Sequence, residues 1–296
     1  MAQEGYSIKD LEKLTGIKAH TIRIWEKRYE IVEPSRTSTN IRYYSDDDLR
    51  KLLNISVLTK YGFKISHLAE LSDDQLAEKI MNLTYQASGY DTQIESLIAA
   101  MIELDDGKFE KTINNATLGM GFENTIVKII YPFLERIGIL WQTGSINPAQ
   151  EHFVSNILRQ KMLVAIDSQV IRPKKDAKRF ILWLPENEFH EIGLLFYSYL
   201  VRKSGNKILY LGQSVPFDDI VEVAKYKTPD VLVTYFTSSQ QDDYIHNYIR
   251  KLAESFPSQK IYISGYQVKD LNESLPSNVH KLTSALAFNE ELKSNY

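Results

Sequence analysis

The sequence predicts a multidomain chain in which an all-helical part is followed by an α/β part. Three observations lead to this prediction. Residues 1–75 are basic and carry short helical patterns, residues 76–172 repeat apolar positions every three or four residues, and residues 177–296 alternate short β-rich runs with helical ones. We therefore expect three domains with these boundaries, with a charged, Pro-containing linker at 172–176.

Composition excludes several classes of function. The chain has 296 residues, of which 43% are apolar and 25% charged, and it has no cysteine. Disulfides, thiolate catalysis and cysteine-held zinc or iron–sulfur centres are thereby excluded, so any metal must bind His, Asp or Glu. The N-terminus lacks a basic segment followed by an apolar run, and nowhere are 18 apolar residues consecutive. These features predict a cytoplasmic protein.

Charge is distributed unevenly along the chain. The formal net charge is −3, yet the segment 18–64 carries ten basic and six acidic residues. This asymmetry indicates one basic module near the N-terminus. The alternative for any single Lys or Arg is an ordinary solvated helix face.

The N-terminal module has the spacing of a helix-turn-helix. A capping-box pattern at 7–10 starts a short helix, Thr15 and Gly16 make a turn, and 18–29 resume a helical period. The second helix of such a motif can enter the major groove, and 40–44 can form the second strand of a hairpin wing. The candidate contacts to base edges and phosphates are His20, Thr21 and Arg23 on the helix and Arg42 on the wing.

This order of motifs resembles the winged-helix DNA-binding domain of MerR-type transcription regulators. The resemblance covers about 70 residues and lies in the run Thr-Ile-Arg-Ile-Trp-Glu-Lys-Arg-Tyr at 21–29, in Pro34-x-Arg36, in Arg42-x-Tyr44 and in Asp48-Leu49. Asn40-Ile41 depart from the Gly-His that light-responsive relatives commonly carry in the wing. The resemblance implies double-stranded promoter DNA as a partner, bound by a homodimer or homotetramer. It adds to the candidate DNA contacts Arg28, Tyr29, Arg36, Tyr43 and Tyr44.

Four helices are predicted for the middle part of the chain, at 91–104, 108–120, 122–138 and 148–171. Because short loops join them, they are expected to form a four-helix bundle.

The period of the apolar residues changes after the linker. Five short apolar runs, at 180–184, 207–211, 230–236, 260–264 and 278–282, read as strands with helices between them, such as 191–202 and 242–256. Strands that are apolar throughout suit a sheet covered on both faces, so this domain is predicted to be a five-stranded doubly wound, Rossmann-like sheet.

A histidine motif follows the first of these strands. Glu188-x-His190-x-x-Gly193 opens the first helix of the α/β domain, which places His190 at the carboxyl edge of the sheet, where ligands bind. A carboxylate two residues before a His can accept the Nδ1 proton and raise the basicity of Nε2 toward a metal. Gly193 would let a bulky planar ligand approach the helix start. Taken singly, a surface His beside a Glu is usually only solvated.

The Glu-x-His-x-x-Gly motif in this position resembles the cobalamin-binding domains of methionine synthase and of light-responsive MerR repressors. The resemblance implies that His190 is the lower ligand of the cobalt and that the displaced nucleotide tail of the cofactor enters a slot beside the sheet. In relatives Ser-x-Val or Ser-x-Leu after the third strand and Gly-Gly after the fourth mark this slot. The matching places here are Thr234-Tyr235-Phe236 and Ser264-Gly265, in which Phe236 and the Ser264 side chain are bulkier than the family pattern.

The helical part carries a second motif of the same group. Trp141 is followed after nine residues by Glu151-His152, a spacing that resembles the cap bundle of CarH/LitR-like repressors. The resemblance implies that these three residues lie over the upper face of adenosylcobalamin or methylcobalamin. The alternatives are a bundle core position for the Trp and a helix surface for the other two. Gln142 stands where photosensing members have the His that ligates cobalt after illumination.

The leading hypothesis is a MerR-type DNA-binding regulator that senses cobalamin and is not an enzyme. Gln142 leaves open whether it also responds to light. The alternative is a regulator whose cobalamin site has decayed, as Phe236 and Ser264 would allow, and which answers to another ligand or a protein partner. A corrinoid carrier in methyl transfer shares the His motif, but the basic N-terminal module argues against it.

Overall fold

The computed structural model describes residues 6–36, 40, 42–83, 90–142, 146–170, 172–238, 244–269, 271 and 275–295. The chain divides into two compact units, Met1–Val154 and Ser155–Tyr296. Helix α10 (Pro148–Asp167) begins in the first unit and ends in the second.

The first unit opens with the helix-turn-helix. Helix α1 (Ile8–Thr15) starts at a complete capping box between Ser7 and Asp10, and Gly16 ends it with a positive φ of 72°. Helix α2 (Ala19–Tyr29) follows directly. The turn is fixed by Glu12, whose carboxylate accepts a hydrogen bond from the Ala19 amide at 3.1 Å and pairs with the Lys18 ammonium at 3.2 Å.

A two-stranded antiparallel wing comes next, formed by β1 (Ser35–Arg36) and β2 (Arg42–Tyr43). Helices α3 (Asp46–Lys60), α4 (Ile65–Leu68) and α5 (Asp73–Leu83) complete this part. One apolar cluster holds the elements together because each helix contributes a buried face, with Leu11, Ile22, Leu52, Leu68 and Leu76 fully buried.

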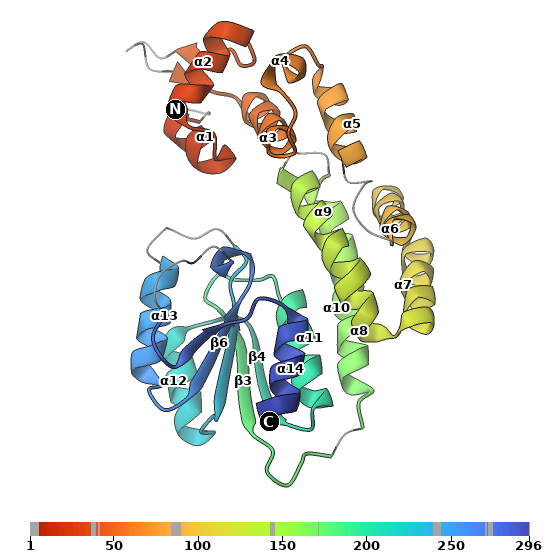
Figure 1. The fold of residues 1–296 in the computed structure, drawn as a ribbon, viewed down its shortest axis with the longest axis vertical. Coiled ribbons are helices and arrows are strands. Elements are labelled where there is room, and N and C mark those ends of the chain that lie inside the picture. Colours follow the sequence, from red (N-terminus) through yellow and green to blue (C-terminus); the bar gives the residue numbers. More distant parts are fainter. Residues whose placement is uncertain are drawn as a thin grey trace. The chain divides into compact units, whose positions relative to one another are not determined.

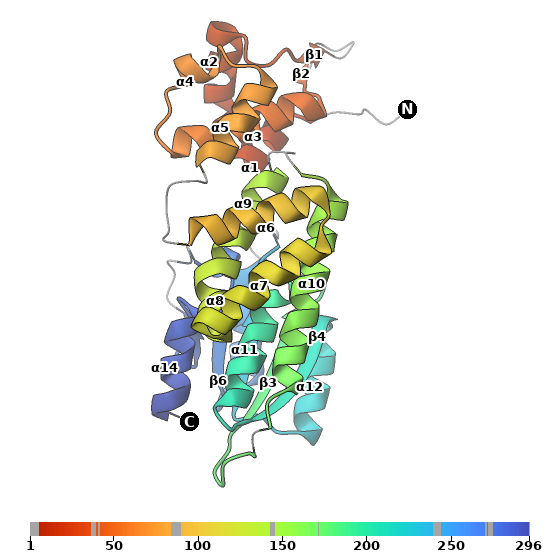
Figure 2. The ribbon, with the colours of Figure 1, turned by 90° about the vertical axis from the view of Figure 1, so that its right-hand side faces the viewer.

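The helical bundle is built from α6 (Asp91–Glu103), α7 (Asp106–Met120), a long helix at 122–142, and α10. The long helix consists of α8 (Phe122–Thr125), a π-helical segment (Ile126–Ile130) and α9 (Tyr131–Gln142). Figure 2 shows α6 and α7 packed side by side. The core includes Phe109 and Phe133, whose ring centroids lie 5.5 Å apart. The predicted four-helix arrangement is confirmed.

The second unit contains a parallel sheet of five strands in the order β4-β3-β5-β6-β7. The strands are β3 (Arg179–Pro185), β4 (Lys207–Val215), β5 (Val231–Tyr235), β6 (Lys260–Ser264) and β7 (Val279–Lys281). The chain runs from β3 outward to β4 and then returns to β5 on the other side of β3. The switch point of this doubly wound sheet therefore lies between β3 and β5, and ligands bind beyond the carboxyl ends of strands at such a point.

Helices cover both faces of the sheet (Figure 1). Helices α11 (Ile192–Lys203) and α14 (Ala285–Asn295) pack on one face, and α12 (Phe217–Tyr226) and α13 (Tyr244–Ser255) on the other. On the α11 face, Phe288 of α14 contacts the rings of Phe180, Tyr197 and Tyr262. On the α12 face, the Trp183 indole nitrogen donates to the Tyr248 hydroxyl at 3.0 Å.

Over the described ranges, none of the helices combines the length and the apolar character that crossing a bilayer requires.

Candidate functional site

Helix α2 presents a polar face to solvent. His20, Arg23 and Arg28 are exposed and Thr21 is half-buried, whereas Ile22, between them in sequence, is fully buried in the apolar cluster. The Arg28 guanidinium lies 5.3 Å from the centroid of the half-buried Tyr29 ring, a cation–π contact that orients both side chains. The candidate base and phosphate contacts of this helix are thus available at the surface.

The wing is fastened to α2 by one carboxylate. Arg42 Nε donates to Glu26 Oε1 at 3.0 Å, and the Tyr44 hydroxyl donates to Glu26 Oε2 at 3.3 Å. Arg36 Nη1 donates to Asn40 Oδ1 at 2.7 Å across the wing, and Tyr43 is half-buried. Ile41 lies outside the described residues.

One predicted DNA contact is wrong. Tyr44 is 0% exposed, so its ring belongs to the core and its hydroxyl is committed to Glu26. Burial, reinforced by the negative charge of Glu26, raises the pKa of Tyr44 to about 12. Tyr44 thus stabilises the wing rather than touching a phosphate.

The cap motif lies on the bundle. Trp141, near the end of α9, is 56% exposed, an unusual exposure for so large an apolar ring. The next residue, Gln142, ends α9, and its side chain lies outside what the structure describes. On α10, His152 Nδ1 lies 3.2 Å from Glu151 Oε2, and both side chains reach the surface. The Trp therefore does not occupy the bundle core, in contrast to the alternative raised from the sequence.

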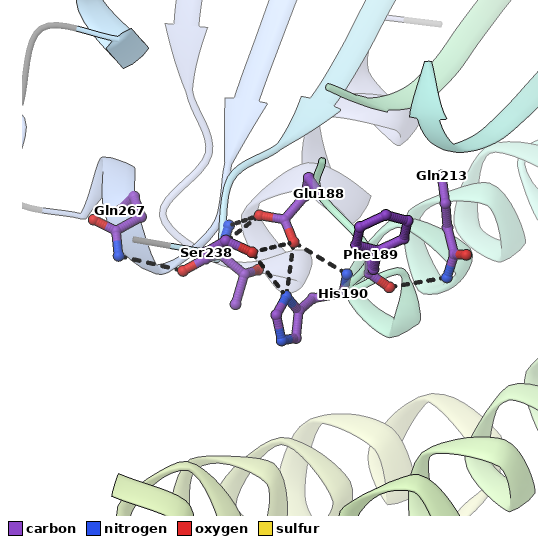
Figure 3. Close-up of polar contacts among 7 residues, drawn as sticks. Glu188, Phe189, His190, Gln213, Ser238 and Gln267 are labelled. Carbon is purple, nitrogen blue, oxygen red and sulfur yellow. Dashed lines mark hydrogen bonds and ion pairs between the residues drawn. The ribbon is translucent and has the colours of Figure 1, made fainter. Parts of the chain in front are cut away.

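The histidine loop lies at the switch point of the sheet. Glu188 and His190 follow β3, and Thr237 and Ser238 follow β5. Figure 3 shows the His190 ring directed away from the sheet edge while its Nδ1 faces Glu188 Oε1 at 2.7 Å. The imidazole is 59% exposed, whereas the Glu188 side chain is almost completely buried.

Glu188 is held by four donors besides the imidazole. The amides of Thr237 and Ser238 each donate to Oε2 at 2.7 Å, and the His190 amide donates to Oε1 at 3.1 Å. The Ser238 hydroxyl donates to Oε1 at 2.9 Å and also lies 3.2 Å from His190 Nδ1. Burial by itself raises the pKa of Glu188, but the hydrogen bonds from His190, Ser238 and Thr237 outweigh it and lower the pKa to about 2.

This network determines which ring nitrogen can bind a metal. An ionised carboxylate accepts the Nδ1 proton, so Nε2 keeps its lone pair and its basicity is raised. One imidazole supplies one axial ligand, which suits a cobalt ion that is already held by its corrin ring. The donor set at His190 therefore fits the lower face of a corrinoid.

A second carboxylate of the same loop is engaged elsewhere. Glu191, at the start of α11, is buried and accepts hydrogen bonds from Arg159 Nε on α10 and from the Tyr210 hydroxyl on β4, the latter at 3.1 Å. These bonds connect α10 to the residue that follows His190.

The space beside Gly193 is filled. A Cβ at Gly193 would lie 2.6 Å from Cζ and 2.8 Å from Cε2 of the Tyr235 ring. The space that the sequence predicted at Gly193 is therefore occupied by the Tyr235 ring.

The predicted tail-slot residues serve the domain interior. Leu232 and Phe236 belong to the core beneath α12 and α13, and by strand alternation Thr234 points to the same face, away from Gly193. Ser264 Oγ lies 2.8 Å from the Tyr197 hydroxyl. Gly265 adopts a φ of +111°, and a Cβ there would lie 2.2 Å from the Phe236 carbonyl oxygen. The expected slot lined by Thr234 and Phe236 is thus not formed, and Gly265 is required by backbone packing.

Sequence reasoning missed four residues that shape these sites, namely Glu26, Glu191, Tyr235 and Ser238. Ser238 could have been inferred, because a small hydroxyl directly after the third strand must lie near the residues that follow the first. Glu26 lies within the recognised run at 21–29, but nothing in the spacing reveals its bonds to the wing.

Comparison with known proteins supports both halves of this description. Residues 6–75 match the model of the MerR HTH family regulatory proteins, and residues 93–165 match that of the B12 binding domain. The chain is 26% identical to the HTH-type transcriptional repressor CarH of Myxococcus xanthus over 263 residues, which cover 87% of each chain. It is 23% identical to the repressor CarA of the same organism over 236 residues, covering 79% of this chain and 77% of CarA.

A solved structure shares the fold of the bundle and sheet. The monomethylamine corrinoid protein of Methanosarcina barkeri superposes with a TM-score of 0.55 at 19% identity, covering 69% of this chain and 99% of that one. At this identity the similarity shows the fold alone. The chain thus carries a MerR-type helix-turn-helix domain and a B12-binding region, and over most of its length it is similar to two HTH-type transcriptional repressors.

Proposed function

We propose that this protein is a corrinoid-responsive regulator in which His190 is the protein ligand of cobalt. The N-terminal winged helix binds promoter DNA as a homodimer or homotetramer, and occupancy of the corrinoid site changes that binding. The chain performs no catalysis in this proposal, in keeping with its relatives CarH and CarA, which are repressors.

A single observation supports the ligand assignment best. The exposed imidazole of His190 has its Nδ1 bonded to a buried carboxylate, and that carboxylate is held by backbone amides from the neighbouring strand end. Such a network fixes the tautomer and the direction of Nε2 before any ligand arrives. An ordinary solvated histidine gains nothing from a carboxylate held by that many donors.

The other predicted site residues are proposed to contact the upper face of the cofactor or the DNA. When bound, a cobalamin would supply a redox-active cobalt whose upper axial group can be lost to light. We assign Trp141, Glu151 and His152 to the upper face of the cofactor, where the exposed indole would be covered on binding. The DNA contacts are assigned to His20, Thr21, Arg23, Arg28 and Arg36, with Tyr29, Arg42 and Tyr43 beside them.

The experiment combines corrinoid loading with DNA binding. Purified protein is incubated with adenosylcobalamin in the dark and passed over a gel-filtration column, and the visible spectrum of the protein peak is recorded. We expect coloured protein with the spectrum of histidine-ligated, base-displaced cobalamin, and a changed affinity for promoter DNA.

Two variants serve as the comparison. His190→Ala is expected to remain folded, because the ring is largely exposed, but to lose the histidine-ligated spectrum. His246→Ala, on the outer helix α13, is the matched control and should behave as wild type. Colourless wild-type protein would contradict the proposal, as would a His190→Ala spectrum identical to that of wild type.

A decayed site is the second candidate, and Tyr235 is the observation that favours it. In that case, the gel-filtered protein is colourless and its DNA binding does not respond to any corrinoid.

A further inference from the structure

The strongest disagreement between the chain and a complete cobalamin lies at Gly193. This residue is the second of helix α11 and lies beside Tyr235 at the carboxyl end of β5, three residues after the proposed cobalt ligand. The absent side chain would create space for a ligand only if nothing else filled it. Tyr235 fills it so closely that even a methyl group would collide with two atoms of its ring, at 2.6 and 2.8 Å, and with its hydroxyl oxygen, at 3.0 Å.

The Tyr235 ring is confined on its other side. Its centroid lies 5.9 Å from that of Tyr197, which is buried in α11. Tyr197 is itself fixed, because its hydroxyl lies 2.8 Å from Ser264 Oγ and its ring packs 5.0 Å from Phe288. Moving Tyr235 deeper into the domain would therefore require this packed cluster to open.

The backbone around Tyr235 is equally constrained. Residue 235 is the last of β5 and is paired with Ser264 of β6 in the sheet register. The next peptide is bonded to the same strand, since the Phe236 amide donates to the Ser264 carbonyl at 2.9 Å. The side chain thus leaves a fixed backbone and points to one face of the sheet.

We propose that Tyr235 is a specificity-determining residue that closes the space beside Gly193, so that this protein binds corrinoids without inserting their nucleotide tail. A fused-ring base is far larger than a methyl group, and a methyl group does not fit. The site therefore recognises the corrin ring and its metal. The ligand class it accepts includes incomplete corrinoids of the cobinamide type, which lack the lower nucleotide base. This inference rests on the proposed function, because it assumes that His190 receives a corrinoid.

Binding energies follow from this geometry. If the nucleotide tail remains in solvent, a corrinoid without the tail loses no contact with the protein. The dissociation constant of adenosylcobinamide is therefore expected to lie within about threefold of that of adenosylcobalamin, or to be lower. Tighter binding is favoured because cobinamide has no base of its own that competes with His190 for the cobalt. A protein that buries the tail shows the opposite order, since it loses the contacts of the base.

The first test requires no corrinoid. Gly193→Ala, Tyr235→Ser and the double variant are compared by urea unfolding. Gly193→Ala is expected to lower the denaturant midpoint in the wild-type background, where the new methyl meets the Tyr235 ring. In the Tyr235→Ser background it should leave the midpoint unchanged or raise it, because Ala favours the helix over Gly. Equal effects in both backgrounds would show that the ring does not lie over Gly193 in solution and would overturn the inference.

The second test compares affinities of the wild type, Tyr235→Ser and the control Tyr266→Ser for the two corrinoids. Tyr266 is an exposed tyrosine of the same domain. Tyr235→Ser is expected to shift the preference toward adenosylcobalamin by roughly tenfold, as the base gains a place to bind, and Tyr266→Ser should not shift it. If Tyr235→Ser does not fold, the ratio of the wild-type affinities for the two corrinoids is sufficient to test the inference.

The outcomes separate this inference from the proposed function. Wild-type protein that binds adenosylcobalamin more than about tenfold better than adenosylcobinamide would overturn the inference and leave the proposed function intact. Binding of neither corrinoid would overturn both.

Discussion

Glu26 and Glu188 use the same chemistry in two different domains. Each is a carboxylate that accepts hydrogen bonds from groups distant in sequence and thereby fixes a loop or wing: Glu26 holds Arg42 and Tyr44, and Glu188 holds the loop after β5. Because a carboxylate offers several lone pairs, one residue can order several donors at once. The rigidity of both candidate sites thus depends on single side chains.

Glu188 also shows which part of a site can be read from sequence. The bond between Glu188 and His190 joins residues two apart and was predicted from their spacing. The bonds from Thr237 and Ser238 cross about 50 residues and depend on which strands are neighbours. Tyr235 was not predicted for a different reason: the slot was expected from Thr234 and Phe236, and alternate residues of a strand face opposite sides of the sheet.

The buried Tyr44 hydroxyl gives a pH prediction for the DNA-binding part. Folding raises its pKa from 10 to about 12, so the stabilisation is complete below pH 10 and is lost as the pH rises toward 12. By linkage the loss is about 3 kcal/mol. The difference in unfolding free energy between wild type and Tyr44→Phe, from urea titrations at pH 8 and pH 11.5, should therefore shrink or reverse at the higher pH. A difference that is independent of pH would contradict the burial of this hydroxyl.

Arg23 is exposed on α2 and is one of the proposed DNA contacts of that helix. Arg23→Ala is expected to weaken promoter binding by roughly 1–3 kcal/mol if the guanidinium reads a base or a buried phosphate. Fluorescence anisotropy at fixed salt measures this, with the exposed linker residue substituted in Arg172→Ala as the control. Arg42→Ala should weaken binding too, but it also frees Glu26, so its unfolding must be measured in parallel. Unchanged affinity in both variants would contradict the docking.

At the scale of secondary structure, the positions of the elements were predicted well and their irregularities were not. The apolar periods located the four bundle helices and all five strands. The π-helical segment at Ile126–Ile130 and the register shifts between β3 and β4 were not predicted, because an inserted residue barely alters a hydrophobic period. The bounds of α4 and α5, which follow the wing, were not predicted either, because the sequence indicated only a helical pattern there.

A substitution at Arg159 tests whether its hydrogen bond to Glu191 stabilises the packing of α10 against the histidine loop. Its Nε donates to the buried Glu191, and Tyr210 supplies the other bond to that carboxylate. Removing the guanidinium leaves Glu191 incompletely paired, and since Arg159 is half exposed we expect Arg159→Ala to cost about 1–2 kcal/mol. Gln160→Ala, at an exposed position of the same helix, controls for changes in helix propensity. Equal unfolding midpoints for the two variants would show that the pair does not stabilise the unit.

At the scale of the whole chain, the order of the modules carried more information than any one motif. A basic helix-turn-helix, a Trp followed after nine residues by Glu-His in a helical bundle, and a histidine after the first strand of a doubly wound sheet are each weak signals alone. Their succession predicted the family, and the domain matches at 6–75 and 93–165 support it. The domain boundaries and the oligomeric state stay predictions, because neither follows from motif order.

Illumination gives a prediction for the intact, loaded protein. Gln142 follows the cap Trp where photosensing relatives carry a second cobalt-binding His, and an amide is a poor ligand for cobalt. We therefore expect illuminated adenosylcobalamin-loaded protein to show no spectrum of cobalt with two histidine ligands, and Gln142→His to introduce one. The appearance of that spectrum in the wild type would contradict the assignment of position 142.

The central claim is that His190 supplies the cobalt ligand in a DNA-binding regulator. Electron paramagnetic resonance of the cobalt(II) form, prepared with unlabelled cobalamin and ¹⁵N-labelled protein, tests it most directly, since the axial nitrogen splits each cobalt line. The account predicts the doublet pattern of a ¹⁵N ligand from the protein, its replacement by a triplet when the protein is unlabelled, and its loss in His190→Ala. A triplet from the labelled protein would show that the cofactor's own base still binds the cobalt, and would contradict the account.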